Sequence, residues 1–152
     1  MMNPILFRIY LIIKLPSAYF CGVRLLYLNE NKCVATVPYK WFSKNPFGST
    51  YFACLAMAAE MSTGVLALAH TYKKNPRVSM LVTRVEGNFM KKATGRTLFM
   101  CDDGSRIEDA VNTALASGKS ITLNTYSYGE DKNGVRIAEF RITWSFMAIT
   151  KK

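Results

Sequence analysis

The chain has 152 residues, half of them hydrophobic, and 20 Lys and Arg against 10 Asp and Glu give it a formal charge of +10 at pH 7. This length supports one domain with a single core, and the apolar content excludes a disordered chain. The basic residues are scattered, whereas a nucleic-acid binder usually gathers them on one element. We therefore expect no nucleic-acid partner, and the basic excess fits a polyanionic small ligand at least as well.

The first 20 residues contain an apolar run that Arg8 and Lys14 interrupt at helical spacing. No clear cleavage site follows it, so the run predicts an amphipathic helix that lies over the domain rather than a signal peptide. Pro16 is expected to end this helix, because proline disfavours helical conformation in the residue before it.

The segment of residues 50–69 is apolar throughout, except for Glu60 near its middle. Its length would suit a membrane span, but the central acid and the many small residues favour a helix buried on nearly every side inside a domain. A charged carboxylate there is costly without a partner. Glu60 is therefore either a structural acid bound to Asn45, a backbone N–H or a basic residue, or an acid with a functional role.

The rest of the chain shows strand patterns separated by turns. Strands are expected over residues 23–28, 33–39, 78–89, 97–101, 120–128 and 135–149. In the last of these, apolar residues occupy alternate positions from Ala138 to Ala148, which indicates a sheet buried on one face. A short surface helix is predicted from a capping box at Ser105 and Glu108 to a stop at Gly118. The sum is a single α+β domain, residues 1–152, with a curved, mostly antiparallel sheet of about six strands wrapped around the long helix.

Four cysteines, at positions 21, 33, 54 and 101, are widely spaced, and the chain has a single histidine. Zinc sites and disulfide frameworks need closer spacing or more ligands. The sequence therefore predicts reduced, mostly buried cysteines, no metal site and a cytoplasmic protein.

Three stretches resemble the hotdog fold of acyl-CoA thioesterases: Asn-Pro-Phe-Gly-Ser at residues 45–49 with the helix that follows, residues 88–95, and residues 134–144. The likeness is greatest to phenylacetate-pathway thioesterase-like proteins and to the DUF4442 / YiiD C-terminal-type group. It implies hydrolysis of an acyl-CoA or acyl-carrier thioester, with a non-catalytic acyl or acyl-CoA binding protein as the alternative. It also implies a homodimer or a dimer of dimers (a homotetramer), and no cofactor beyond the coenzyme A of the substrate.

The resemblance implies site residues as well. Asn45 matches a loop asparagine near the thioester, and the N–H groups of Gly48 and Ser49 would hold the carbonyl oxygen at the start of the helix. Glu60 would act as base or nucleophile, with a pKa raised by burial. The substrate-binding candidates are Phe47, Thr63, Lys91, Lys92 and Arg96, of which the basic residues would contact the phosphates of coenzyme A.

Two departures separate this chain from the thioesterase pattern. Phe47 stands where many relatives carry a histidine, and Ser49 replaces the second glycine of their His-Gly-Gly. Glu60 also lies one helical turn, about 5 Å, beyond the usual acid, whose position corresponds to Ala56. These departures favour the binding-protein alternative.

Overall fold

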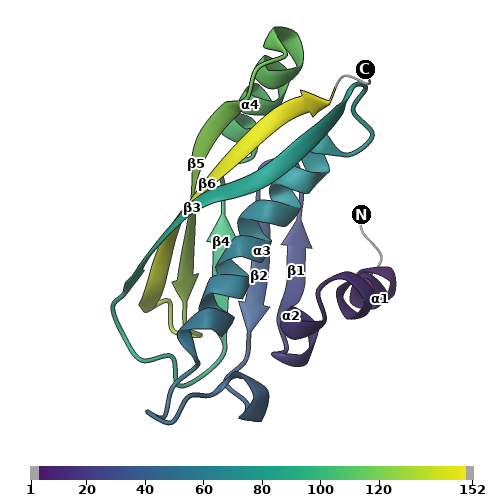
Figure 1. Ribbon diagram of the computed structural model, residues 1–152. Helices are drawn as coiled ribbons and strands as arrows, with labels where there is room; N and C mark the ends of the chain where they lie inside the picture. Colours follow the sequence, from purple (N-terminus) through teal and green to yellow (C-terminus); the bar gives the residue numbers. More distant parts are fainter. Residues whose placement is uncertain (1–3, 150–152) are drawn as a thin grey trace.

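One antiparallel sheet of six strands forms the frame of the computed structural model, which describes residues 4–149. The strands lie in the order β1-β2-β4-β5-β6-β3, and the sheet curves around the long helix α3 (Phe52–Thr71; Figure 1). Their bounds are β1 Arg24–Leu28, β2 Cys33–Val37, β3 Arg77–Phe89, β4 Thr97–Cys101, β5 Ile121–Glu130 and β6 Arg136–Ile149. The expected α+β architecture is confirmed.

Strand β6 shows why the sheet has one buried face. The alternate residues that the sequence places inside, from Ala138 through Trp144 to Ala148, are all buried, whereas Arg141 between them is exposed. β6 pairs with both β3 and β5 along nearly its whole length. It therefore holds the longest strands together and adds buried apolar side chains to the core.

Helix α3 is buried over most of its circumference and leaves one partly exposed strip. Its buried residues, among them Ala58, Ala59 and Leu66, belong to the hydrophobic core that the helix shares with the sheet. Along the strip Ala56 and Glu60 keep part of their surface exposed, as do Ala53, Met57 and Gly64. The expectation of burial on nearly every side therefore fails along this strip, which the sheet and the neighbouring helices leave uncovered. By length and composition α3 could cross a membrane, but half of it lies inside this fold.

Helix α3 begins at Phe52 rather than at residue 50. The Thr50 N–H donates to Ala93 O at 2.8 Å, and the Tyr51 N–H donates to Ser43 O at 2.7 Å. These bonds to other segments hold the chain extended as far as Tyr51, so the helix starts only after it.

Helix α4 (Gly104–Ser117) begins before the predicted capping box. The prediction of a cap at Ser105 and Glu108 was wrong, since Asp103 is the N-cap residue and no side chain caps the helix. The helix starts at Gly104 because this residue passes closely over the turn after β1, where its N–H donates to Asn31 O at 3.1 Å. The predicted stop at Gly118 is confirmed, with φ at 65° in the left-handed region.

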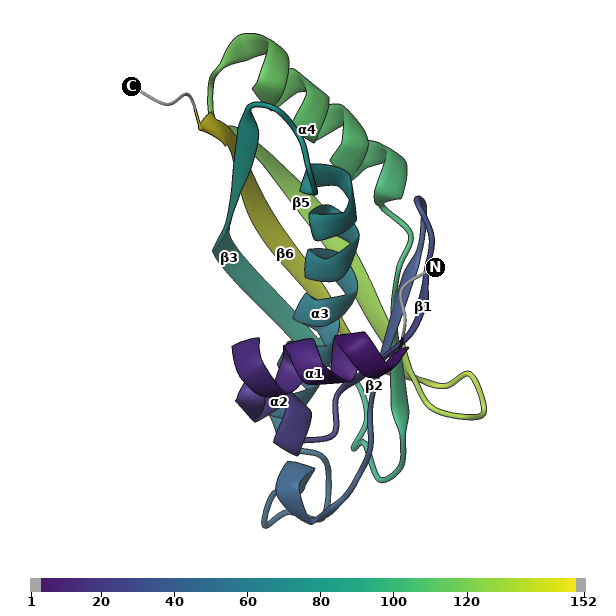
Figure 2. The same cartoon turned by 90° about the vertical axis from the view of Figure 1, so that its right-hand side faces the viewer.

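Two short helices precede the sheet. Pro16 ends α1 (Pro4–Lys14), as predicted, and it also begins a second helix, α2 (Pro16–Phe20), because proline suits the first turn of a helix. Figure 2 shows α1 crossing in front of α3 with α2 beneath it. A 3₁₀ helix, η1 (Trp41–Ser43), lies between β2 and α3 in the sequence.

Gly104 offers a sharp test of the packing between α4 and the β1–β2 turn. A Cβ atom at this position would lie 2.1 Å from the Glu30 carbonyl oxygen and 2.4 Å from Asn31 Cα. We expect Gly104→Ala to lower the free energy of unfolding by about 3 kcal/mol, because the backbone must move apart. Chemical denaturation measures the change. Gly95→Ala is the control, since a Cβ there has no neighbour within 4 Å. Equal stabilities of the two variants would contradict the packing described.

Candidate functional site

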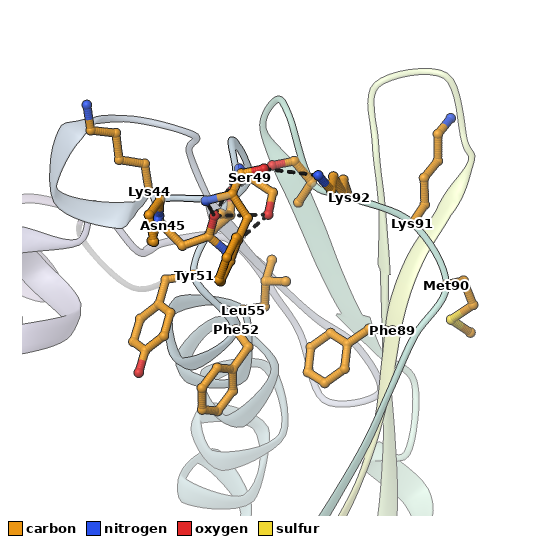
Figure 3. A pocket seen from close by; sticks show the side chains of 14 residues that line it. Lys44, Asn45, Ser49, Tyr51, Phe52, Leu55, Phe89, Met90, Lys91 and Lys92 are labelled. Atoms are coloured by element: carbon orange, nitrogen blue, oxygen red, sulfur yellow. Dashed lines mark hydrogen bonds between the residues drawn. The ribbon is translucent and has the colours of Figure 1, made fainter.

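A cleft of about 810 Å³ opens at the N-terminal end of α3, between the loop before that helix and the segment after β3 (Figure 3). Its wall is mainly apolar and includes Tyr51, Phe52, Leu55, Phe89 and Met90. The rings of Phe52 and Phe89 meet edge to face with centroids 6.4 Å apart. A hollow of this size and lining can hold an acyl chain or another apolar group.

Three lysines stand on the rim of the cleft. Lys44, Lys91 and Lys92 line it and are exposed, and Figure 3 shows Lys44 and Lys91 directed away from the apolar wall. Lys92 Nζ donates to the Phe47 carbonyl oxygen at 3.0 Å. Cations beside an apolar cleft suit a ligand that has both an apolar and an anionic part.

Asn45 shapes the loop that forms one side of the cleft. Its Oδ1 accepts hydrogen bonds from the N–H groups of Phe47, at 3.0 Å, and Ser49, at 3.1 Å. Its Nδ2 donates to Ser49 Oγ at 3.1 Å. The side chain of Asn45 is therefore occupied within the loop, where it holds Ser49 at the edge of the cleft.

The backbone N–H groups near the helix start fall into two sets. Gly48, at a φ of 73°, and Ser49 donate their N–H groups to the carbonyl oxygen and Oδ1 of Asn45, respectively. The N–H groups of Phe52 and Ala53, in the first turn of α3, have no acceptor among residues 4–149. Free N–H groups at a helix N-terminus favour a negatively charged oxygen. The sequence reasoning missed this pair because it began the helix at residue 50.

Glu60 lies outside the cleft, on the partly exposed side of α3, about 12 Å along the helix from Phe52. Its Oε1 would be 2.8 Å from a Cβ on Gly64, and the same Cβ would be 3.1 Å from the Trp144 ring. Its carboxylate has no hydrogen bond or ion pair to any residue from 4 to 149, so the structural bonds considered for it are not formed. Burial raises the pKa of this carboxyl above its ordinary value.

The other predicted substrate-binding residues divide between the cleft and its surroundings. Phe47 lines the cleft with its ring largely exposed. Arg96 is exposed but does not line the cleft. Thr63 is buried, and its hydroxyl donates to Glu60 O at 3.1 Å and accepts from Trp144 Nε1 at 3.0 Å. These bonds give Thr63 a place in the packing of α3 against β6.

The residues that line the cleft include no cysteine. All four cysteines are free, and Cys54 Sγ lies 3.5 Å from Cys21 Sγ. Burial raises the pKa of Cys54 to about 12, so its thiol stays protonated near neutral pH. Within residues 4–149, no group of three or more His, Cys, Asp or Glu side chains could hold a metal ion.

Comparison with known proteins places this geometry in a family. Residues 5–145 match the family described as "Domain of unknown function (DUF4442)". Among curated proteins, none matches this chain.

Solved structures of the same fold include proteins named as thioesterases. A Pseudomonas aeruginosa protein of unknown function, described as "Probable Thioesterase", is similar with 21% identity and a TM-score of 0.81 over 98% of this chain and 99% of its own. A variant of a thioesterase from the same organism has 12% identity and a TM-score of 0.74, covering 98% of this chain and 96% of its own. A Haemophilus influenzae thioesterase has 10% identity and a TM-score of 0.68, covering 99% and 94%. The expected hotdog fold is thereby confirmed.

The raised pKa of Glu60 predicts a pH-dependent effect on stability. Above the ordinary value of 4.5, the unfolded chain releases this proton more readily than the folded protein does, so the carboxyl group lowers stability as pH rises. We expect Glu60→Gln to be more stable than the native chain at pH 8, with the difference vanishing toward pH 4, in urea denaturation. Glu108→Gln, at an exposed position on α4, is the matched control. An increase in stability that is the same at both pH values would contradict a raised pKa of Glu60.

Proposed function

Because this chain belongs to the DUF4442 family and shares its fold with thioesterases, we propose that it hydrolyses the thioester of an acyl-CoA or an acyl-carrier protein. The observation that carries the proposal is the cleft at the start of α3, where an apolar wall, a basic rim and free backbone N–H groups lie together. An acyl-CoA has the matching parts: an apolar chain, a thioester carbonyl and anionic phosphates.

In this proposal the acyl chain contacts Phe52 and Phe89, and the phosphates contact Lys91 and Lys92, with Arg96 reaching in from the next turn. The carbonyl oxygen lies at the N-terminus of α3, where backbone N–H groups stabilise the negative charge that develops on it. The N–H groups of Phe52 and Ala53 are free for this task. Those of Gly48 and Ser49 join them if the substrate displaces their bonds within the loop. Asn45 positions that loop.

Glu60 is proposed to be the general base. A base must come within about 3 Å of its proton, and Glu60 lies along α3 away from the cleft of its own chain. We therefore assign Glu60 to the cleft of a second copy. Its raised pKa suits removal of a proton from water as the water oxygen attacks the thioester carbon. The carbon–sulfur bond then breaks, and the carrier thiolate takes up the proton.

Two unpartnered surfaces support a homodimer with shared sites. The first is the side of α3 that carries Glu60, which the sheet leaves uncovered. The second is β3, a long strand at the edge of the sheet with exposed apolar residues Leu81, Val85 and Phe89. An apolar edge strand of this length pairs readily with another chain. Association through both surfaces would bury the open side of α3 and bring Glu60 to the partner's cleft.

A cytoplasmic location goes with this proposal. The four cysteines are free, and a reducing compartment keeps thiols in that state. Hydrolysis by a carboxylate and backbone donors requires no cofactor beyond the coenzyme A of the substrate.

The second candidate function is acyl-CoA binding without hydrolysis. It is favoured by the hydrogen bond that the Ser49 N–H donates to Asn45 Oδ1, because this N–H is then not free to hold the carbonyl oxygen of a thioester. It is also favoured by the position of Glu60, one turn beyond that of the usual acid. Saturable binding of an acyl-CoA without release of free thiol would identify this function.

The first experiment follows free thiol release from short, long and aromatic acyl-CoAs. We expect Glu60→Gln to lower kcat by at least about a hundredfold, because general-base catalysis contributes that much or more. Glu108→Gln, the matched control, should keep the native rate. Asn45→Asp should retain more activity than Asn45→Ala, since it keeps the Oδ1 acceptor of the loop bonds. An unchanged rate in Glu60→Gln would refute the mechanism.

A mixing experiment tests the shared site. Phe52→Asp disrupts the apolar wall of the cleft, and Glu60→Gln removes the base, so each homodimer is expected to be inactive. In co-expressed mixtures, a mixed dimer contains one intact site, and about one quarter of the native activity should return. If the mixtures recover no activity, the shared site is refuted. A monomer in sedimentation equilibrium would also refute it, because the whole site would then lie within one chain.

A further inference from the structure

The N-terminal helices carry an exposed apolar surface that the proposed catalysis does not use. Within α1, Leu11 is the buried residue and most of the remaining apolar side chains are exposed. The residues of this N-terminal apolar surface, each between 46% and 72% exposed, are Leu6, Ile9, Ile12, Ile13, Phe20, Trp41 and Phe42. A contiguous apolar patch on a folded domain marks a site of interaction with a protein or a membrane.

These residues come from three elements but form one surface. The rings of Phe20 and Phe42 have centroids 6.2 Å apart, and those of Trp41 and Phe42 lie 4.8 Å apart. Helices α1 and α2 lie together on the outside of α3 in both ribbon views (Figures 1 and 2). The patch therefore runs from α1 over the end of α2 to η1.

The charged residues of the segments that form this surface are nearly all basic. The first 59 residues of the sequence contain a single acid, Glu30, and the basic residues Arg8, Lys14, Arg24, Lys32, Lys40 and Lys44. Arg8, Lys14 and Lys40 are exposed beside the apolar patch. Glu30 lies beyond the far end of β1, where its carbonyl oxygen is 2.7 Å from His70 Nε2 at the end of α3. Within the first 59 residues, the apolar and basic groups of this surface thus occur without a nearby carboxylate.

We propose that the N-terminal apolar surface binds the face of an anionic lipid bilayer. Apolar side chains enter the boundary between headgroups and acyl chains, and lysine and arginine side chains contact anionic headgroups. Exposed Trp41 suits this depth, since tryptophan is enriched at membrane–water interfaces. A second copy of the chain is a poorer occupant, because symmetric pairing would bring Arg8, Lys14 and Lys40 of both copies together.

This surface lies next to the cleft. Lys44, on the cleft rim, follows η1 directly in the sequence. Attachment would therefore hold the mouth of the cleft near the bilayer, where long acyl chains partition. This last step rests on the proposed function, whereas attachment itself does not.

Binding to phosphatidylcholine vesicles with and without phosphatidylglycerol tests the proposal. We expect cosedimentation with the anionic vesicles only, and weaker binding as sodium chloride is raised. Of the two tryptophans, Trp41 is exposed and Trp144 is 5% exposed. A blue shift of tryptophan emission on binding would therefore come from Trp41, and Trp41→Phe should lose the shift.

Two pairs of substitutions separate the charge from the apolar contact. Lys14→Gln with Lys40→Gln should weaken binding roughly thirtyfold, because each lysine near an anionic membrane surface raises the affinity by about fivefold. Ile13→Ser with Phe42→Ser should weaken it at least about tenfold. Lys119→Gln with Lys132→Gln removes the same charge from exposed positions in the loops before and after β5, and binding should change by less than about threefold. Circular dichroism checks that the variants are folded.

Several outcomes would overturn the proposal. Absence of binding to phosphatidylglycerol vesicles at low salt refutes it, and so does equal binding to both kinds of vesicle. If Ile13→Ser with Phe42→Ser dissociates an oligomer in the absence of vesicles, the surface belongs to a second copy of the chain. Vesicle binding is measured without substrate, so a failure here is independent of any failure of thioester hydrolysis.

Discussion

Helix α3 has apolar side chains on every face, yet the sheet and α4 leave one strip of it uncovered. Hydration of the apolar side chains on this strip is unfavourable, and both the proposed dimer and the proposed role of Glu60 depend on it. The strip carries Glu60, whose carboxyl group is partly desolvated but has no partner within residues 4–149. The edge strand β3 lies exposed in the same chain. A second copy of the chain that covers this strip and β3 would remove their apolar surface from water. It would also bring the Glu60 carboxyl group to a cleft, where it can act as a base.

The cleft depends on how the chain enters α3. Bonds from Thr50 to Ala93 and from Tyr51 to Ser43 keep this segment extended, and the internal bonds of Asn45 close the loop before it. The helix consequently starts at Phe52, beside the apolar wall, with its first N–H groups free. One small set of hydrogen bonds thus places the aromatic side chain and the polar donors of the site at the same point.

Folding gathers the basic residues of the N-terminal segments on one side of the protein. In the sequence the basic residues are scattered, but the N-terminal part has nearly no acids. Folding brings α1, α2 and η1 together on one side of the molecule (Figure 2), and the rings of Phe20 and Phe42 meet there. An exposed apolar and basic surface suits an extended partner such as a bilayer, whereas a small ligand requires a concave site.

By itself, the sequence determined the features that depend on local patterns. Four features could be predicted because each depends on neighbours within a few residues. They are the period of two in β6, the helix end at Gly118, the helix end before Pro16 and the apolar helix with its central acid. Only the tertiary structure decided where α3 and α4 begin, that Thr63 bonds to Trp144, and that Glu60 lies away from the cleft of its own chain. These features depend on contacts between segments distant in the sequence, such as Gly104 with the turn at Asn31, and no local pattern encodes such a contact.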